Sequence, residues 1–534
     1  MTGETDPDAR SEESFGSIGI GPIRRAGYNI LTWDARGFGG SGGEVDLHDP
    51  KVGGRDGQAL LDHVARQPEA QLDAPGDPRA GMSGSSYGGI IQVVLAAIDR
   101  RVDAIAPSIT PNSYLTALYP DQTVKAGWGA ILSGVSATSI PLGAFSPAGP
   151  QLGNLDRRIY RGLAEGVATG KFSPEIVRFF DERGPRRVVA RVRVPTLFME
   201  GLADTLFPVD EATRNQAAVA RNGAPTKTMW FCGGHGLCTG DNGPNGRLEA
   251  ATIRWLDRWV KRDASVDTGP KFEWLADNED AWRTAKRFPP RAGTRLRGTE
   301  SGLLPLTPAS PATGGGALIA ATPALDAVNV AIEPPAKELP QPNAAARAVG
   351  AVDVLGAPRV KLTYSGTATP PKTYLFAQVV DGGTGRVVGN QVTPIPVTLD
   401  GRRRSVLRDL EPVATRAGPG SRYRVQVAAG STVYGLQRSA GVANLERVDA
   451  SLPVVASAAT SEGAASGGAV TEPAAEDQPA ARKAGSGEDA ASELGGSGGD
   501  GDGLPVTGLE LLALTILGAA MLSTGLVLRR RRLP

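Results

Sequence analysis

One short segment of the chain carries the pattern of a nucleophilic serine. Residues 84–88 read GSSYG and match G-x-S-x-G, in which the central serine, Ser86, stands on a sharp turn between a strand and a helix. A serine hydroxyl is a weak nucleophile at neutral pH, so it needs a histidine base that a carboxylate orients. The chain must therefore supply a histidine and an acid from elsewhere in the sequence.

The G-x-S-x-G pattern alone does not identify the nucleophile, because the chain has 70 glycines in 534 residues. Ser41 and Ser497 stand at the centre of two further matches. Ser41 lies in a predicted loop with no apolar helix behind it, and Ser497 lies in a low-complexity segment. Only Ser86 is followed by an apolar, helix-like run, at 90–98, and this context favours Ser86.

The sequence offers three histidines as the base, and His235 fits best. It lies in a GGHG stretch directly after an apolar run at 226–231, where a loop at the end of a strand can place it over the edge of a sheet. His48 lies in a polar loop, and His63 lies on a predicted amphipathic helix. We interpret His48 and His63 as solvated or packed side chains.

Asp204 is the candidate acid. It lies between Ser86 and His235, as the order Ser, Asp, His requires, and it follows a predicted buried strand at 194–199. Loops after the carboxyl ends of parallel strands are where α/β sheets place their sites. Asp210 is the nearest alternative, but it stands at a predicted helix start, where an N-cap role is expected.

Strands and helices alternate around these residues, which predicts a parallel α/β sheet. The predicted strands are 28–33, 102–107, 194–199 and 226–231. More than 70 residues separate the second of these strands from the third, too many for one crossover helix. We therefore expect a helical cap over the site, at about 111–187.

Together these segments resemble the α/β-hydrolase fold, and more narrowly the X-Pro dipeptidyl-peptidase and cocaine-esterase group of serine hydrolases, over about residues 20–290. The resemblance implies cleavage of a peptide, amide or ester through an acyl-enzyme on Ser86. It implies that His235 is the general base and then the general acid, and that Asp204 orients it. The backbone N–H of Tyr87 is then one oxyanion-hole donor.

The chain divides into four parts by composition and pattern. We assign residues 1–270 to the hydrolase domain and 271–450 to an all-β, jelly-roll-like sandwich, because apolar and polar residues alternate there. Residues 451–503 are rich in Ala, Gly, Ser and Glu and contain no aromatic residue, so we predict a disordered spacer. Residues 504–534 form the fourth part.

This C-terminal part combines a short motif, an apolar run at 509–528 and four arginines at 529–532. Twenty residues suffice for a transmembrane helix, and the arginines keep the tail cytoplasmic. A plain membrane anchor is one interpretation. The motif, the apolar run and the arginines, in this order, resemble the sorting signal of Gram-positive wall proteins. This resemblance implies that a sortase joins Thr507 to cell-wall peptidoglycan. The motif consists of Leu504, Pro505, Val506, Thr507 and Gly508.

The two cysteines, Cys232 and Cys238, flank His235. Three interpretations are open: a disulfide, which suits an exported protein, two free thiols, or zinc held with His235. No feature of the sequence calls for a cofactor. The formal net charge of +1 gives no field that would gather nucleic acid.

The N-terminal residues 1–19 are polar and acidic and lack the pattern of a signal peptide. They also hold no apolar run for the strand and the second oxyanion-hole donor that normally precede a strand such as 28–33, so the sheet is expected to lack its first strands. Our hypothesis is that Met1 is an internal start. The alternative function, a non-catalytic surface-binding protein built on a degenerate or truncated hydrolase domain, rests on the same observation.

Overall fold

The computed structural model describes residues 16, 18–38, 41–132, 154–238, 246–290, 292–308, 324, 327–333, 351–418, 420–455 and 459–460. The predicted spacer after residue 460, the motif Leu504–Gly508 and the apolar run at 509–528 lie outside these residues. Within the described ranges, no helix has the length and apolar character needed to cross a membrane.

A seven-stranded sheet organises the first part of the chain, in the order β18-β8-β7-β6-β5-β4-β3. The strands from β3 to β7 are parallel, and β8 and β18 add antiparallel at the far edge. Ser85 is in register with Ser108, and Gly201 with Phe231, so the carboxyl ends of four strands meet at one edge. The strands are β3 (Ala80–Ser85), β4 (Val102–Ser108), β5 (Thr196–Gly201), β6 (Thr226–Phe231), β7 (Phe272–Leu275), β8 (Trp282–Ala285) and β18 (Ala459–Thr460).

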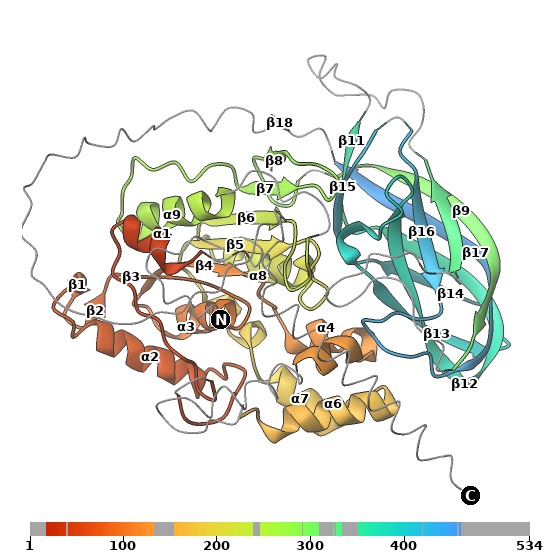
Figure 1. The fold of residues 1–534 in the computed structure, drawn as a ribbon, viewed down its shortest axis with the longest axis horizontal. Helices are drawn as coiled ribbons and strands as arrows, with labels where there is room; N and C mark the ends of the chain where they lie inside the picture. Colours follow the sequence, from red (N-terminus) through yellow and green to blue (C-terminus); the bar gives the residue numbers. More distant parts are fainter. Residues whose placement is uncertain are drawn as a thin grey trace, which may run out of the picture. The chain divides into compact units, whose positions relative to one another are not determined.

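Helices cover both faces of this sheet (Figure 1). On β5, Leu197 and Met199 pack with the apolar face of α9, whereas Phe198 packs on the opposite side with α3 and α8. Each such fully buried side chain stabilises the fold by about 1.5–3 kcal/mol. The helices are α1 (Ile20–Arg25), α2 (Gly53–Val64), α3 (Tyr87–Ile98), α8 (Val209–Arg221) and α9 (Arg247–Trp259), and a small hairpin joins β1 (Leu72–Ala74) and β2 (Asp77–Pro78).

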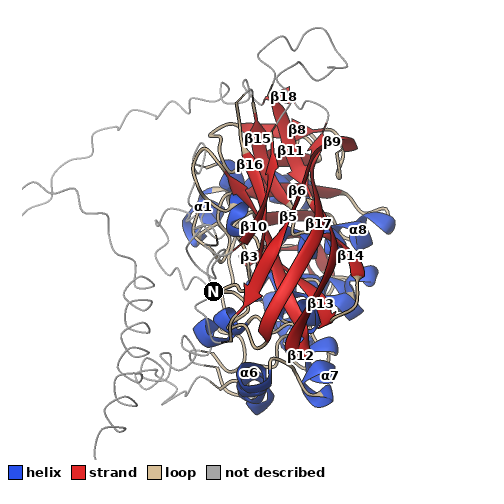
Figure 2. Ribbon diagram, turned by 90° about the vertical axis from the view of Figure 1, so that its right-hand side faces the viewer, coloured by secondary structure: helices blue, strands red, loops and turns tan. Residues whose placement is uncertain are grey.

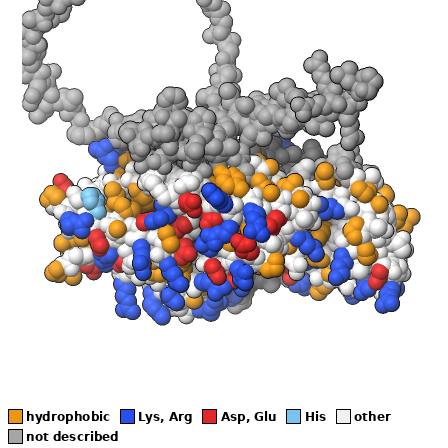
Figure 3. Space-filling model, turned by 90° about the horizontal axis from the view of Figure 1, so that it is seen from below, with side chains coloured by type: hydrophobic (Ala, Val, Ile, Leu, Met, Phe, Trp, Pro, Cys, Tyr) orange, Lys and Arg blue, Asp and Glu red, His pale blue; other side chains and the backbone are white. Residues whose placement is uncertain are grey.

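Short helices occupy the predicted cap segment between β4 and β5. Phe180 and Trp128 of this segment pack in one apolar cluster with Phe376 and Tyr434 from the C-terminal part of the chain. On the face that Figure 3 shows, Lys and Arg side chains lie interspersed with Asp and Glu side chains rather than separated by sign. The described helices are α4 (Tyr114–Leu118), η2 (Pro120–Gln122), α6 (Arg157–Thr169), α7 (Pro174–Asp181), η3 (Pro185–Arg187) and η4 (Val189–Arg191).

A nine-stranded antiparallel sheet forms the second part, with the long strands β12 and β17 paired at its centre (Figure 2). Along β12, Val360 and Leu362 are buried while Arg359 and Lys361 are exposed, the alternation expected of a sheet with one solvated face. The strands are β9 (Ala292–Leu306), β10 (Ala327–Ile332), β11 (Val352–Gly356), β12 (Arg359–Asp381), β13 (Thr393–Asp400), β14 (Arg404–Asp409), β15 (Val413–Ala417), β16 (Tyr423–Ala428) and β17 (Ala440–Val455), with a 3-10 turn, η5 (Val388–Asn390).

The apolar run at 28–33 is not the buried strand that its composition predicts. No ladder pairing is formed there among the described residues, and Leu31 remains 40% exposed. Tyr28 instead donates a hydrogen bond from its hydroxyl to Asp257 of α9, at 2.9 Å. A β-rich run becomes a strand only beside a partner strand, and within the described residues β3 pairs on one side only, with β4.

Two predicted domain boundaries also differ from the structure. The run Phe272–Leu275 pairs in parallel with β6, and β8 follows it in the same sheet, so residues 271–285 extend the first sheet rather than begin the second. At the other end, β17 continues to Val455 within the predicted spacer. In both cases the local sequence is compatible with either assignment, and the available pairing partner decides.

Candidate active site

Ser86 stands on a sharp turn between the end of β3 and the start of α3. Its backbone angles, φ +53° and ψ −118°, lie in a region that side chains other than glycine rarely adopt. The Ser86 N–H donates to the carbonyl of Ser108 at the end of β4, at 2.9 Å. The turn therefore projects the hydroxyl beyond the carboxyl edge of the sheet, as the G-x-S-x-G pattern predicts.

Gln92 of α3 stabilises the turn at Ser86 through hydrogen bonds of its side-chain amide. Its side-chain amide donates to the carbonyls of Gly84 and Gly88, at 3.0 and 2.9 Å, and its carbonyl oxygen accepts the N–H of Ala106 on β4, at 3.1 Å. Sequence reasoning did not select Gln92, although a single amide inside the apolar run IIQVVLAAI is itself a signal. A buried amide in such a run needs partners.

Helix α3 also has to pass very close to β4. A methyl group added at Gly89 would collide with the hydroxyl of Thr110 and lie 2.9 Å from the carbonyl oxygen of Ser108. At Gly88 the same methyl group would meet nothing within 4 Å. Gly89 is therefore required for the helix to approach the strand, whereas Gly88 borders open space next to the serine.

The structure brings the three predicted side chains together, although Ser86 and His235 are 149 positions apart in the sequence. His235 Nε2 lies 2.7 Å from Ser86 Oγ, and His235 Nδ1 lies 2.6 Å from Asp204 Oδ2. The Asp204 side chain is fully buried, and 12% of the His235 side chain is exposed. With its Nδ1–H donated to Asp204, the imidazole keeps Nε2 free to accept the serine proton.

The carboxylate of Asp204 has partners on both oxygens. Oδ1 accepts the N–H groups of Leu206 and Phe207, at 2.9 and 2.8 Å, and Oδ2 accepts the N–H of His235, at 3.1 Å, besides its Nδ1 bond. A buried carboxylate is costly unless it is hydrogen-bonded, and here each oxygen accepts two bonds. These bonds hold the Asp204 side chain in a fixed orientation toward the imidazole.

The loop that carries His235 is pinned at its base. Cys232 and Cys238 form a disulfide with a Cα–Cα distance of 5.1 Å, which replaces the alternatives of free thiols and of zinc. Gly234 has φ +120°, and a Cβ atom there would lie 2.6 Å from Cβ of Asp204. The glycine before His235 is therefore what allows the two loops to approach each other.

Aromatic side chains line the imidazole. Phe207 and Trp128 are both buried, and both meet the ring of His235 edge-on, with centroid distances of 5.0 and 6.0 Å. Trp128 Nε1 also donates to the hydroxyl of Thr205, next to Asp204, at 2.9 Å. From the sequence alone, such an aromatic residue in the cap could not be distinguished from a packing residue.

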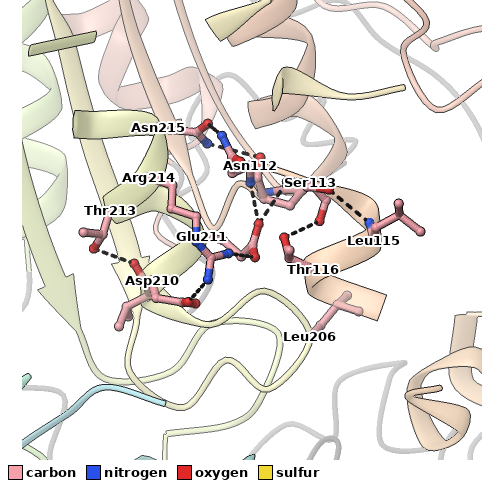
Figure 4. Close-up of polar contacts among 12 residues, drawn as sticks. Asn112, Ser113, Leu115, Thr116, Leu206, Asp210, Glu211, Thr213, Arg214 and Asn215 are labelled. Carbon is pink, nitrogen blue, oxygen red and sulfur yellow. Dashed lines mark hydrogen bonds and ion pairs between the residues drawn. The ribbon is translucent and has the colours of Figure 1, made fainter. Parts of the chain in front are cut away.

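The network in Figure 4 joins α8 to the chain where it leaves β4. Glu211 Oε2 accepts the N–H groups of Asn112 and Ser113, at 2.8 and 2.9 Å, and Arg214 pairs with both Glu211 and Asp210. Asp210 is therefore not the N-cap that its position predicts: the helix starts after Pro208, and the Asp210 carboxylate turns to Arg214.

The other serine and histidine positions that the sequence offered take no part in the hydrogen-bonded path from Ser86 to Asp204. Ser41 donates its hydroxyl to the carbonyl of Asp34, at 2.7 Å, and Ser497 lies outside the described residues. His48 is buried against the ring of Tyr87, at a centroid distance of 3.8 Å, and burial lowers its pKa to about 3. His63 interacts with Gln67 on the exposed side of α2.

The predicted oxyanion-hole donor, the N–H of Tyr87, occupies the first position of α3. The N–H groups of the first helical turn have no carbonyl partner within their own helix, so they suit a developing negative charge. The region in which we expected no second donor is residues 1–19, and of these the structure describes only residues 16, 18 and 19.

Comparisons with known proteins agree with this architecture. Residues 4–236 match the model of the X-Pro dipeptidyl-peptidase (S15) family. No curated protein sequence matches the chain.

Solved structures share the fold across both sheets. An α-amino acid ester hydrolase is 13% identical with a TM-score of 0.58, covering 84% of this chain and 90% of its own. A CocE/NonD family hydrolase from Staphylococcus aureus is 11% identical with a TM-score of 0.54, covering 79% of each chain. An aminopeptidase from a marine sediment Thaumarchaeota archaeon is 14% identical with a TM-score of 0.52, covering 84% and 91%. The fold is thus an α/β-hydrolase-like parallel sheet with an antiparallel β-domain.

Proposed function

We propose that the chain is a hydrolase of the X-Pro dipeptidyl-peptidase (S15) family, whose model residues 4–236 match, and that it cleaves an amide or ester through an acyl-enzyme on Ser86. The observation that carries this proposal is the continuous hydrogen-bonded path from Ser86 Oγ to His235, 2.7 Å, and on to Asp204, 2.6 Å. The path starts at Ser86, whose backbone conformation is rare for residues other than glycine.

The proposed reaction follows from this path. Oγ of Ser86 attacks the substrate carbonyl carbon while Nε2 of His235 takes its proton, and the carbonyl oxygen becomes an oxyanion facing the N–H of Tyr87. Nε2–H then protonates the leaving amine or alcohol, and the bond to it breaks. Water, deprotonated by the same nitrogen, releases the acid and restores Ser86. Asp204 stabilises the transient imidazolium throughout.

For the substrate, we propose an ester or amide with a small, uncharged acyl group. Phe207 and Trp128 pack edge-on against His235, and an ammonium is costly to bury in such surroundings unless a carboxylate pairs with it. An X-Pro dipeptidyl-peptidase has to bind the N-terminal ammonium of its substrate, and such a site calls for a carboxylate beside the acyl group. The Asp204 carboxylate is already committed to His235.

A fluorophosphonate probe tests the reactive serine directly. We expect the purified full-length protein to be labelled, Ser86→Ala to abolish labelling, and Ser41→Ala, at the other described G-x-S-x-G match, to label like the wild type. Absence of labelling in the folded wild-type protein would instead support the alternative, a non-catalytic surface-binding protein. Turnover rates of p-nitrophenyl esters and of X-Pro aminoacyl amides then distinguish the two substrate classes. Faster turnover of the amides would contradict the proposal that the acyl group is uncharged.

We also propose attachment to the Gram-positive cell wall through Thr507. The support is the sequence order of motif, apolar run and arginines at 504–534. In a sortase-positive host, the protein is expected in the wall fraction released by a peptidoglycan hydrolase, and Thr507→Ala should move it to the membrane fraction. Equal wall recovery of both proteins would contradict attachment at Thr507.

A further inference from the structure

The loop that carries Asp204 is held by a buried cation from the cap segment. Lys125 is only 3% exposed, and its Nζ donates to the backbone carbonyls of Thr205 and Leu206, at 2.7 and 3.1 Å. These are the two residues directly after the candidate acid. A buried ammonium is costly to desolvate, so its position needs an explanation beyond packing.

Other donors fix the same short loop. From the cap segment, Trp128 Nε1 donates to the hydroxyl of Thr205. From the β-domain, the side-chain amide of Gln391 donates to the carbonyls of Leu202 and Asp204, at 2.9 and 3.0 Å. The loop is therefore held on one side by Lys125 and on the other by Gln391. Of these two side chains, only Lys125 brings a charge.

Acidic side chains lie within electrostatic reach of that charge. Burial lowers the pKa of Lys125, and the negative field of the surrounding acids opposes this shift. Arg214 lies among the same acids and pairs with two of them, as Figure 4 shows. The acids are Glu411 of the β-domain, Asp210 and Glu211 of α8, and Asp204 itself.

We propose that Lys125 is a positioning residue of the hydrolase: it holds the Asp204 loop through two carbonyls, and its charge keeps the Asp204 carboxylate and the neutral imidazole in their reactive forms. This inference rests on the proposed function. A positive charge beside the pair stabilises the carboxylate and disfavours an imidazolium in the resting enzyme. Lys125 itself takes no part in bond making.

The test compares the fluorophosphonate labelling rate across pH for the wild type, Lys125→Met and Gln391→Leu. Lys125→Met removes donor and charge at similar length, whereas Gln391→Leu removes donors alone. We expect Lys125→Met to label about 10- to 100-fold more slowly, as a small misplacement of catalytic groups does, and its acidic limb to move to higher pH. Gln391→Leu should label more slowly with the limb unchanged, and Lys125→Arg should recover much of the loss.

The outcomes separate this inference from the proposed function. A folded wild-type protein that does not label defeats the proposed function. A wild type that labels, with Lys125→Met labelling equally fast at every pH, overturns the role of Lys125 alone. A uniform loss with no movement of the acidic limb would reduce Lys125 to a structural residue and also overturns the proposal. If circular dichroism shows that Lys125→Met is unfolded, Lys125→Gln, a donor without charge, takes its place under the same criteria.

Discussion

The turn at Ser86 and the loop at Asp204 serve one site, but they are held in different ways. The turn is fastened by near neighbours: Gln92 bonds across 4 to 14 positions of the sequence. The loop is held by Lys125 from 80 positions before it and by Gln391 from 187 positions after it. The nucleophile is thus a local property of one strand and helix, whereas the acid depends on the cap segment and the β-domain together.

The largest expected effect comes from the acid itself. Asp204→Asn keeps the size of the side chain but lets the imidazole adopt the wrong tautomer, so kcat/KM should fall by roughly 10³- to 10⁴-fold. Asp210→Asn, at the nearest alternative acid, should reduce kcat/KM by less than about tenfold, because Asp210 pairs with Arg214. Rates of ester hydrolysis give kcat/KM for both variants. Equal losses would contradict the assignment of Asp204 as the acid that orients His235.

Next in size is the approach of α3 to β4 at the turn. Gly89→Ala should lower the free energy of unfolding by about 3 kcal/mol, because the new methyl group collides with Thr110 and lies too close to the carbonyl of Ser108. Gly88→Ala, whose methyl group meets nothing, is the control and should be neutral or slightly stabilising. Urea titration compares the two. Similar values would mean that the turn is less tightly packed than its contacts indicate.

A smaller effect is expected from the disulfide beneath His235. The double change of Cys232 and Cys238 to Ala should lower the free energy of unfolding by about 2 kcal/mol, because a short covalent loop is released in the unfolded chain. Thermal unfolding with and without a reducing agent measures the effect. If the double variant responds to reductant as the wild type does, the difference has another source.

The smallest effect concerns the β-domain contact behind the acid loop. Asp277 donates its N–H to Ala414, next to the turn that carries Gln391, and burial raises the pKa of its carboxyl from 3.8 to about 6. The folded protein therefore holds this proton more tightly than the unfolded chain, so stability is greatest below about pH 4 and falls as the pH rises to about 6. Asp277→Asn should remove this fall and stabilise the protein at pH 7 by about 1–2 kcal/mol.

Melting temperatures of the wild type and Asp277→Asn at pH 4, 5, 6 and 7 check this sign. The curves should converge at the acidic end and separate toward neutrality, with the variant above. A variant that melts at a lower temperature than the wild type at pH 7 would contradict this prediction. It would show that the ionised Asp277 carboxylate stabilises the folded protein.

The sequence predicted much of the local structure correctly. The helix after Ser86 and the strands before Asp204 and His235 are formed as their apolar runs indicate, because hydrophobic periodicity and glycine placement act within a few residues. The strand at 28–33 and the boundary at 270 were wrong. Both depend on which neighbouring strand is available for pairing, and the local sequence does not determine that neighbour.

The sequence by itself determined which residues are chemically able to form the site: one serine on a sharp turn, one histidine between glycines and one aspartate after a strand. Only the tertiary structure decided how the aspartate is held. Gln391 and Lys125 each stand in segments whose local pattern says nothing of Asp204, because a side-chain donor finds a distant carbonyl only after separate elements have packed. The position of the Asp204 loop therefore depends on contacts with the cap segment and the β-domain, and its own residues do not determine it.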